Sequence, residues 1–423
     1  MAPSHPAVFT TQTPYPLPPQ KFMIPSTWSR YQLSQLINKA LALAQPIPFD
    51  FLLHGDILKT RLSDWCSQNG VGEEETLEIE YIESVLPPQK ISDLPHDDWV
   101  SSVSCRFEQL FVTASYDGSL RAFDYSQTQT WSSPVHAAPI TAFCAVSSTS
   151  SGSHIIATAS HDLTAQLNEV SFGTPENTKR LASLHLHTAP LSAITCNLSG
   201  TQLLTASWDS LVGLWDTRIP DEDEVPEAAT GDRKKRRKVQ EERPKRKAPL
   251  MVLKSHTARV SAVIFASEGE GAISCGLDST VRSWDLEHGV STNTLTLSER
   301  PFVSMCSGPA FSPRTVLAAS TDRTITQYDC RETQSIASLT LTHPTTPSCV
   351  VSAPSHPHQV LSGAYDGVAR IWDLRSVKGA TPVASFKAWE DKKILDVSWK
   401  TGGIVAIGGG GGLSIWKVGE EQL

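Results

Sequence analysis

The chain has 423 residues, of which 39% are hydrophobic and 19% are charged, and its formal net charge is -8 at pH 7. This length predicts two or three domains, or one large repeat domain with a smaller domain beside it. The mild negative charge argues against nucleic-acid binding over the whole surface, and no apolar run approaches the roughly 18 residues of a membrane span, so we expect no membrane partner.

The first 83 residues predict a small mixed domain that differs from the rest of the chain. Residues 7–13 and 21–27 predict a hairpin, and a helix with Ser26 or Thr27 as its cap is expected to follow. A strand and turn over 48–58, a helical turn at 61–70 and a last strand at 76–85 complete the pattern. This order is that of a ubiquitin-like α+β fold, the β-grasp, which we place at residues 1–84.

Three consecutive glutamates lie just ahead of the last strand of this domain. The turn residues Asn69, Gly70 and Gly72 precede them, and alternating apolar residues follow them. The glutamates are therefore expected on a loop, where solvated surface charge is the simplest explanation of the residues taken alone. They are Glu73, Glu74 and Glu75.

Residues 99–423 contain a repeat of about 45 residues. A turn aspartate recurs at intervals of 45, 47, 69, 44 and 44 residues, and a degenerate copy, "IGGGGGLSIWK", ends the series. A period of 40–45 residues with a Trp-Asp signature is typical of WD40 blades, each of four antiparallel strands. Seven copies predict a mainly β chain with a closed seven-bladed propeller. The six aspartates are Asp117, Asp162, Asp209, Asp278, Asp322 and Asp366.

Three repeats contain a full set of the polar side chains that hydrogen-bond inside a WD blade. The set has a histidine on the entry loop, a Ser or Thr on the second strand, the turn aspartate, and a tryptophan on the third strand. We assign these residues to structure and expect no enzyme activity and no cofactor of the chain's own. In the other repeats Phe123, Leu167 and Tyr328 are expected in place of the tryptophan. The sets are His187, Thr205, Asp209 and Trp215; His256, Ser274, Asp278 and Trp284; His343, Ser362, Asp366 and Trp372.

The last blade is expected to borrow a strand. Little sequence follows the third strand in "LSIWKV", and an unpaired sheet edge would invite aggregation. The missing strand is therefore expected within the linker of residues 85–98, between Pro87 and Trp99.

The interval of 69 residues indicates an insertion of about 24 residues at about 219–249, after the third blade. Its first half is acidic and its second half is basic, and it has too few apolar residues to offset the entropy of ordering. We expect a disordered loop, whose deletion over 221–247 should leave the propeller folded. Its basic clusters suggest nuclear import, contact with RNA phosphates, or both. The import residues are Lys234, Lys235, Arg236, Arg237, Lys238, Lys245, Arg246 and Lys247.

The whole chain resembles the YTM family of ribosome biogenesis proteins, the WD-repeat-twelve type. The resemblance rests on "PIPFDFLLHGDILKTRLSDW", "GEEETLEIEYIESVLPP", "HDDWVSSV" and seven blades with the insertion after the third. It implies a non-enzymatic assembly factor of the large (60S) ribosomal subunit, required for pre-rRNA processing and particle maturation. It also implies location in the nucleus, nucleolus and nucleoplasm, in a trimer with a Pescadillo-like protein and a Bop/Erb-type propeller protein on pre-60S particles.

The resemblance further implies that midasin, an AAA ATPase, grips the ubiquitin-like domain and removes the trimer from the particle. A loop glutamate of the client completes the coordination of Mg²⁺ in the adhesion site of midasin, and Mg²⁺ prefers carboxylate oxygens. Glu74 matches that glutamate, with Glu73 and Glu75 as register alternatives. Three glutamates on the strand itself are alternatives for the metal ligand, but their alternation is better explained by an exposed strand face: Glu78, Glu80 and Glu83.

Two other functions are open. "WDTR" and "WDLR" resemble the boxes through which a WD40 substrate receptor docks on a cullin-RING ubiquitin ligase. A Notchless-like midasin client would also join a gripped domain to a propeller, but the blade count and the position of the insertion argue against it.

Overall fold

A computed structural model gives the structure of the chain. It describes residues 3–43, 45–72, 74–148, 153–172, 178–225, 243–266, 271–296, 300–308, 314–331, 339–376 and 381–419. The chain divides into two compact units. The first contains Met1–Pro87 with Asp373–Val383, and the second contains Pro88–Trp372 with Ala384–Leu423.

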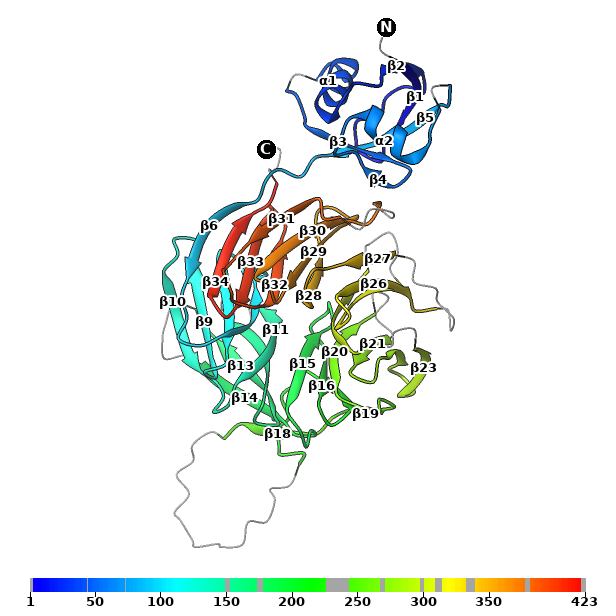
Figure 1. Cartoon of the computed structure of the whole chain (residues 1–423). Helices are drawn as coiled ribbons and strands as arrows, with labels where there is room; N and C mark the ends of the chain where they lie inside the picture. The colour runs from blue at the N-terminus through cyan, green and yellow to red at the C-terminus, as the bar shows by residue number, and fades with distance from the viewer. Residues whose placement is uncertain are drawn as a thin grey trace, which may run out of the picture. The chain divides into compact units, whose positions relative to one another are not determined.

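The first unit has a mixed sheet of strand order β2-β1-β5-β3-β4 in its described residues (Figure 1). Strands β1 and β5 run parallel at the centre, and the other neighbours run antiparallel. This is the expected β-grasp arrangement, with the short strand β4 in addition. The elements are β1 (Ser4–Thr10), β2 (Lys21–Pro25), α1 (Arg30–Leu41), β3 (Phe49–Leu53), β4 (Asp56–Ile57), α2 (Leu62–Asn69) and β5 (Leu77–Glu83).

The alternation of apolar residues explains the central strand of this sheet. Leu77, Ile79 and Tyr81 of β5 point into the core, where the helix contributes Leu33 and Ile37, one turn apart. The expected helix cap was wrong, because α1 begins after Ser29. There the Ser29 N–H donates to the side-chain carbonyl of Gln32 at 3.0 Å, half of a capping box.

Ser26 does not cap the helix, because its backbone groups are hydrogen-bonded to two other segments of the domain. Its N–H donates to the Pro3 carbonyl at 2.8 Å, and its carbonyl accepts from the Ser63 N–H at 2.7 Å. These two bonds fix Ser26 between the N-terminal strand and α2, which leaves the helix to begin four residues later.

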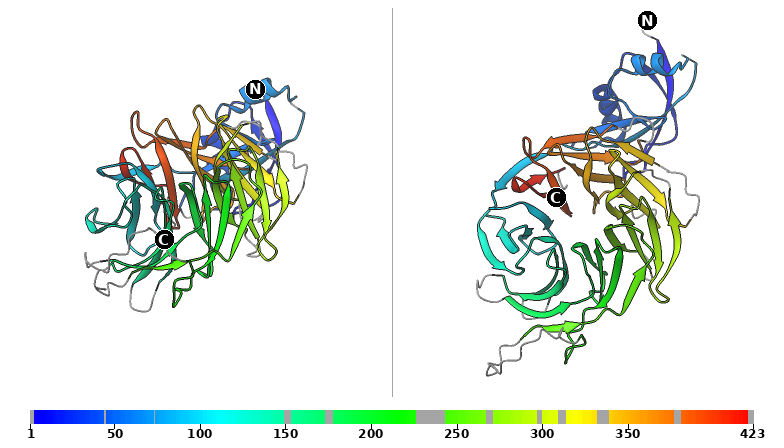
Figure 2. Two further views of the ribbon diagram at one scale, coloured as in Figure 1. Left: turned by 90° about the horizontal axis from the view of Figure 1, so that it is seen from below. Right: turned by 60° about the horizontal axis from the view of Figure 1, so that its bottom comes forward.

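The second unit is a propeller of seven antiparallel blades in the described residues, arranged around a common axis (Figure 2). The first strands of neighbouring blades contact one another, and β32 contacts β7 to close the ring. The prediction of a mainly β chain with a seven-bladed propeller is confirmed. Blades one to three contain β7 (Val100–Ser104), β8 (Leu110–Ser115), β9 (Ser119–Asp124), β10 (Gln129–Pro134); β11 (Ile140–Ser148), β12 (His154–Ser160), β13 (Ala165–Val170), β14 (Thr178–Leu184); β15 (Leu191–Cys196), β16 (Gln202–Ser207), β17 (Leu211–Asp216) and β19 (Met251–Lys254).

The later blades follow the same order from the axis outward. They contain β20 (Val260–Phe265), β21 (Gly271–Gly276), β22 (Val281–Asp285), β23 (Val290–Leu295); β24 (Phe302–Ser307), β25 (Thr315–Ser320), β26 (Thr324–Asp329), β27 (Leu339–Thr342); β28 (Pro347–Ser352), β29 (Gln359–Ala364), β30 (Val368–Asp373), β31 (Ala384–Lys387); β32 (Ile394–Lys400), β33 (Ile404–Gly409) and β34 (Gly412–Lys417).

The outer strand of blade seven comes from the beginning of the propeller sequence. Strand β6 (Gln89–Leu94) pairs antiparallel with β34, in a register that places Leu94 opposite Leu413 and Gln89 opposite Lys417. The structure thus places the closing strand inside the stretch expected for it. The pairing covers the edge that β34 would otherwise leave open.

Candidate functional site

The acidic turn lies between α2 and β5 of the first unit. Helix α2 ends at Gly70 in a left-handed conformation with φ of 68°, which glycine adopts without strain. Glu74 and Glu75 follow and are both exposed, and the Glu75 N–H donates to the Gly72 carbonyl at 3.3 Å. Glu73 lies outside the described residues. The turn therefore presents carboxylates to solvent.

The scaffold behind this turn is rigid. Strand β5 pairs with β1 on one side and with β3 on the other, and Leu77, three residues after Glu74, is 1% exposed. No hydrogen bond or ion pair joins Glu74 to another described residue. Such a free carboxylate, next to a fixed strand, can supply one oxygen to a metal ion held by another protein.

The described residues contain no group of three or more His, Cys, Asp and Glu side chains that could hold a metal ion by themselves. The glutamates on β5 also fit the metal role less well than Glu74. Glu78 is exposed, but Glu80 and Glu83 are partly buried along the strand.

Blades three and four contain the predicted hydrogen-bond sets. In blade three His187 contacts Asp209 through Nδ1 at 3.1 Å and Thr205 through Nε2 at 2.8 Å, and the Trp215 N–H donates to Thr205 at 2.9 Å. Burial lowers the pKa of His187, although Asp209 opposes this. In blade four the same contacts are made at 2.7–2.8 Å by His256, Ser274, Asp278 and Trp284.

In blade six the predicted set is incomplete. His343 contacts Ser362 at 3.1 Å, and Trp372 donates to Ser362 at 2.8 Å, but Nδ1 of His343 has no hydrogen-bond partner among the residues that the structure describes. Asp366 is held by Arg370 instead, with Nη2 2.6 Å from Oδ2. A guanidinium on the third strand therefore competes with the histidine for the aspartate.

Blade two contains a complete set that the sequence interpretation missed. His136 contacts Asp162 at 2.6 Å and Thr158 at 2.8 Å. Asn168 donates to Thr158 at 3.3 Å and takes the place of the tryptophan. The assignment of Leu167 to that place was wrong by one residue. The tryptophans of the other sets each lie six residues after the turn aspartate, and so does Asn168. The spacing from Asp162 in the sequence would therefore have identified Asn168.

The described ends of the insertion are ordered, which corrects the expectation of a disordered loop over the whole of 219–249. Residues Lys245–Lys247 form strand β18, which pairs in parallel with β14 of blade two (Figure 1). The Glu224 N–H donates to the Arg246 carbonyl at 2.9 Å, and the Ala248 N–H donates to Oε2 of Glu224 at 2.9 Å. Backbone pairing and these bonds join the two ends of the insertion.

The two basic clusters differ in their place in the structure. The import residues Lys234, Lys235, Arg236, Arg237 and Lys238 lie outside the described residues. Lys247 is only 3% exposed, and its ammonium group donates to Asp216 and to the Arg218 carbonyl. Burial lowers the pKa of Lys247 to about 8. A buried lysine cannot contact an import receptor, so Lys247 is removed from the import residues.

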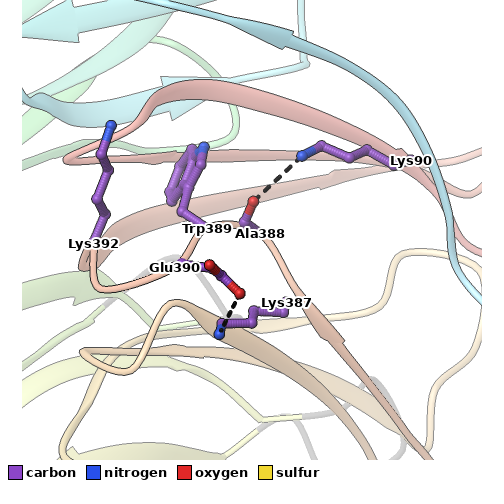
Figure 3. Close-up of a pocket in the computed structure, with 6 residues that line it drawn as sticks. All are labelled: Lys90, Lys387, Ala388, Trp389, Glu390 and Lys392. Atoms are coloured by element: carbon purple, nitrogen blue, oxygen red, sulfur yellow. Dashed lines mark hydrogen bonds and ion pairs between the residues drawn. The ribbon is translucent and has the colours of Figure 1, made fainter.

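A pocket of 430 Å³ lies beside blade seven and is lined by Lys90, Lys387, Ala388, Trp389, Glu390 and Lys392 (Figure 3). Lys90 donates to the Ala388 carbonyl at 3.4 Å, and Lys387 pairs with Glu390 at 3.3 Å. The lining is mainly basic, with three lysines and one glutamate. The cysteine thiols of the chain are unpaired, and burial raises the pKa of Cys105 to about 12, which keeps that thiol protonated.

Two protein families match the chain. The NLE (NUC135) domain matches residues 6–66. The WD domain, G-beta repeat, matches residues 89–124, 178–216, 247–285 and 335–373.

Curated relatives match the chain over nearly its full length. The ribosome biogenesis protein YTM1 of Laccaria bicolor is 59% identical over 437 residues, which cover 99% of this chain and 96% of the relative. The protein of the same name from Coprinopsis cinerea is 56% identical over 432 residues, with coverage of 98% and 95%. That of Aspergillus fumigatus is 32% identical over 443 residues, with coverage of 91% and 88%.

Proposed function

Since the chain belongs to the YTM1 family of ribosome biogenesis proteins, we propose that it is a non-enzymatic assembly factor of the large (60S) ribosomal subunit. It acts in pre-rRNA processing and particle maturation. In this role the propeller is a scaffold in a trimer with a Pescadillo-like protein and a Bop/Erb-type propeller protein. The β-grasp domain is the handle by which midasin removes the trimer from the particle.

The exposed carboxylate of Glu74 is the observation that carries the handle proposal. Glu74 lies on a turn directly before the central strand of a rigid sheet and has no partner among the described residues. A metal ion with one open coordination position needs an oxygen ligand whose position is fixed by a scaffold. Glu74 would supply that oxygen to Mg²⁺ held by midasin, and Glu75 is the described neighbour in reach of the same role.

The proposed location is the nucleus, with the nucleolus and nucleoplasm as sites of particle maturation. The basic cluster Lys234–Lys238 is the proposed import signal. Short runs of Lys and Arg are typical of such signals. Lys245 and Arg246 of the second cluster stay candidates for the same role, whereas Lys247 is buried against Asp216 and is not part of the signal.

Isolation of the tagged full chain from a nuclear extract tests the assembly role. We expect two partners in near-equal amounts, a Pescadillo-like protein and a second propeller protein, together with precursors of the large ribosomal subunit. A cullin and its adaptor in near-equal amounts, with no ribosomal precursors, would show a ubiquitin-ligase receptor instead. A variant with the five basic residues at 234–238 changed to Gln controls for entry into the nucleus.

A further inference from the structure

The blades present a repeated pair of residues at one end of the propeller axis. Each pair joins the turn after the second strand of a blade to the residue just before its first strand. The first residue of the turn donates its N–H to the carbonyl of that residue, at 2.8–3.2 Å. First strands are innermost, so these pairs surround the axis. The pairs are Trp99 and Tyr116, Pro139 and His161, Pro190 and Trp208, Arg259 and Leu277, Pro301 and Thr321, Thr346 and Tyr365, and Lys393 and Gly410.

Aromatic side chains occupy one part of this ring, which we call the aromatic rim: Trp99, Tyr116, His161, Trp208 and Tyr365. Trp99 stacks on Tyr116 with ring centroids 6.4 Å apart. Tyr116 is 6.5 Å from His161, which is 5.5 Å from Trp208. Trp99, Trp208 and Tyr365 are 42%, 40% and 39% exposed. Trp99, Tyr116, His161 and Trp208 thus form a continuous row of rings with an exposed tryptophan at each end, and exposed apolar surface of this kind marks an interaction site.

Two cations face the aromatic rim: the exposed Lys393, whose ammonium lies 4.9 Å from the centre of the Tyr365 ring, and the partly buried Arg259. The guanidinium carbon of Arg259 lies 4.0 Å from the centre of the Trp208 ring. Burial lowers the pKa of Arg259, although the nearby hydroxyls of Tyr116 in blade one and Tyr365 in blade six oppose this. Its Nε is buried and has no hydrogen-bond partner, and no carboxylate among the described residues pairs with its guanidinium.

An arginine that is partly desolvated and unpaired is costly, unless a ligand supplies the missing acceptor. The carboxylates nearest in sequence to the rim do not meet this need, because other groups hold them. Asp98 accepts from the Trp99 N–H at 2.7 Å, and Asp117 and Asp366 pair with Arg121 and Arg370 at 2.5 Å and 2.6 Å. Asp162 and Asp209 contact the histidines of their own blades.

The same turn aspartates indicate what kind of ligand fits. A turn aspartate directly follows each of the rim residues Tyr116, His161, Trp208 and Tyr365. Arg121 and Arg370 neutralise two of these carboxylates. Those of Asp162 and Asp209 contact histidines instead, border the rim and would repel the closely spaced phosphates of a nucleic acid. A peptide with a single carboxylate next to an aromatic or aliphatic side chain meets the Arg259 guanidinium and an apolar surface without this repulsion, while Lys393 is already engaged with the Tyr365 ring.

We propose that the aromatic rim and Arg259 form a binding site for an extended segment of a partner protein, in which an Asp or Glu lies beside an aromatic or aliphatic residue. The carboxylate pairs with the Arg259 guanidinium in a bidentate contact, and the neighbouring side chain packs on Trp208 and Tyr116. This site goes beyond the scaffold role of the propeller, and it neither uses Glu74 nor depends on midasin.

Selection from a displayed library of random 12-residue peptides, with the full chain as bait, tests the proposal. We expect enrichment of peptides with an acidic residue next to an aromatic or aliphatic one on the wild type and none on Arg259→Gln. The best peptide, labelled with a fluorophore, should bind about tenfold or more weakly to Arg259→Gln or Trp208→Ala, a loss of at least 1.4 kcal/mol. Replacement of its carboxylate by an amide should weaken binding equally.

A control variant separates this site from general loss of structure. Tyr125 is 43% exposed and follows the third strand of blade one, at the other end of the axis, so Tyr125→Ala should bind as wild type. Arg259→Lys keeps the charge and should retain part of the binding. Failure to enrich acidic peptides, or equal enrichment on Arg259→Gln, would overturn the proposal. Tighter binding of an oligouridine probe, lost in the same variants, would overturn it in favour of an RNA surface.

Discussion

An arginine two positions before the third-strand aromatic can draw the turn aspartate away from its histidine. Blade three has Gly213 there, and Asp209 contacts His187. Blades one and six have Arg121 and Arg370 there, and each arginine takes the aspartate. Blade four is the instructive exception: Arg282 donates to Ser255 and Thr280 and lies 3.7 Å from Asp278, which still contacts His256 at 2.8 Å.

Double-mutant cycles should reveal this difference between blades. In blade three, Asp209→Ala and His187→Ala should be coupled by about 0.5–3 kcal/mol in the free energy of unfolding, because the two side chains share a hydrogen bond. In blade six, Asp366→Ala and His343→Ala should add within about 0.5 kcal/mol. Equal coupling in the two blades, measured by urea unfolding, would show that Arg370 does not divert Asp366.

The histidine that loses its aspartate should make stability depend on pH. Burial and the nearby Arg370 lower the pKa of His343 from 6.5 to about 4. The unfolded chain therefore binds this proton first as the pH falls. Its contribution of up to about 3 kcal/mol is present above pH 6.5 and is lost as the pH falls through 4.

Replacement of this histidine should reduce the loss of stability in acid. His343→Gln is expected to show a smaller fall in unfolding free energy between pH 6.5 and pH 4 than the wild type does. A His343→Gln curve parallel to that of the wild type would mean that His343 is not responsible.

At the scale of elements, the β33–β34 hairpin shows why blade seven has a run of glycines. A Cβ on Gly411 would lie 2.4 Å from Cε2 of Trp389, and one on Gly409 would lie 2.1 Å from the Lys393 carbonyl oxygen. The missing side chains make room for Trp389 and for the entry loop. The sequence indicated a turn here, but the tryptophan that requires the glycines could be seen only in three dimensions.

Two neighbouring glycines provide a matched test of this packing. Gly411→Ala should destabilise the propeller by about 1–3 kcal/mol, because Trp389 must move to avoid the new methyl group. Gly410→Ala should be nearly neutral, since its nearest neighbour is Cε2 of Trp99 at 3.6 Å. Urea unfolding of both variants decides the point, and equal stability of the two would contradict the role of Trp389.

Strand β18 shows where composition misleads. The segment "KRK" has no apolar residue and predicts a solvated charge cluster, but it pairs with β14 and buries Lys247 against Asp216. The sequence therefore predicted the insertion and not the strand at its end. Deletion of 221–247 would remove β18, so we now expect that deletion to lower the melting temperature.

A narrower change should separate import from folding. Replacement of residues 226–242 with a short Gly-Ser linker keeps β18 and the bonds of Glu224, so the melting temperature should stay close to that of the wild type, since loop length changes stability slowly. Nuclear accumulation of the isolated chain should fall, as seen by fluorescence microscopy in cells without its partners. Undiminished accumulation would argue against the import role of Lys234–Lys238.

At the scale of the whole molecule, the repeats made the propeller predictable because each blade has the same turn aspartate at a nearly constant interval. The β-grasp domain was predictable from the order of its elements, although the two-residue strand β4 was too short to be noticed. The aromatic rim was not predicted, because its members are spread from residue 99 to residue 365 and meet only when the ring closes.

The most direct measurement is the binding of the purified full chain to the adhesion domain of midasin, with Mg²⁺ or with EDTA. We expect Mg²⁺-dependent binding by the wild type and by Glu78→Ala, whose substitution lies on the exposed face of β5. Glu74→Ala should remain folded, since an exposed carboxylate adds little stability, but should not bind. Glu74→Asp should bind weakly, because its side chain is one methylene shorter. Wild-type binding by Glu74→Ala, or binding that persists in EDTA, would contradict the role of Glu74 as a ligand of Mg²⁺.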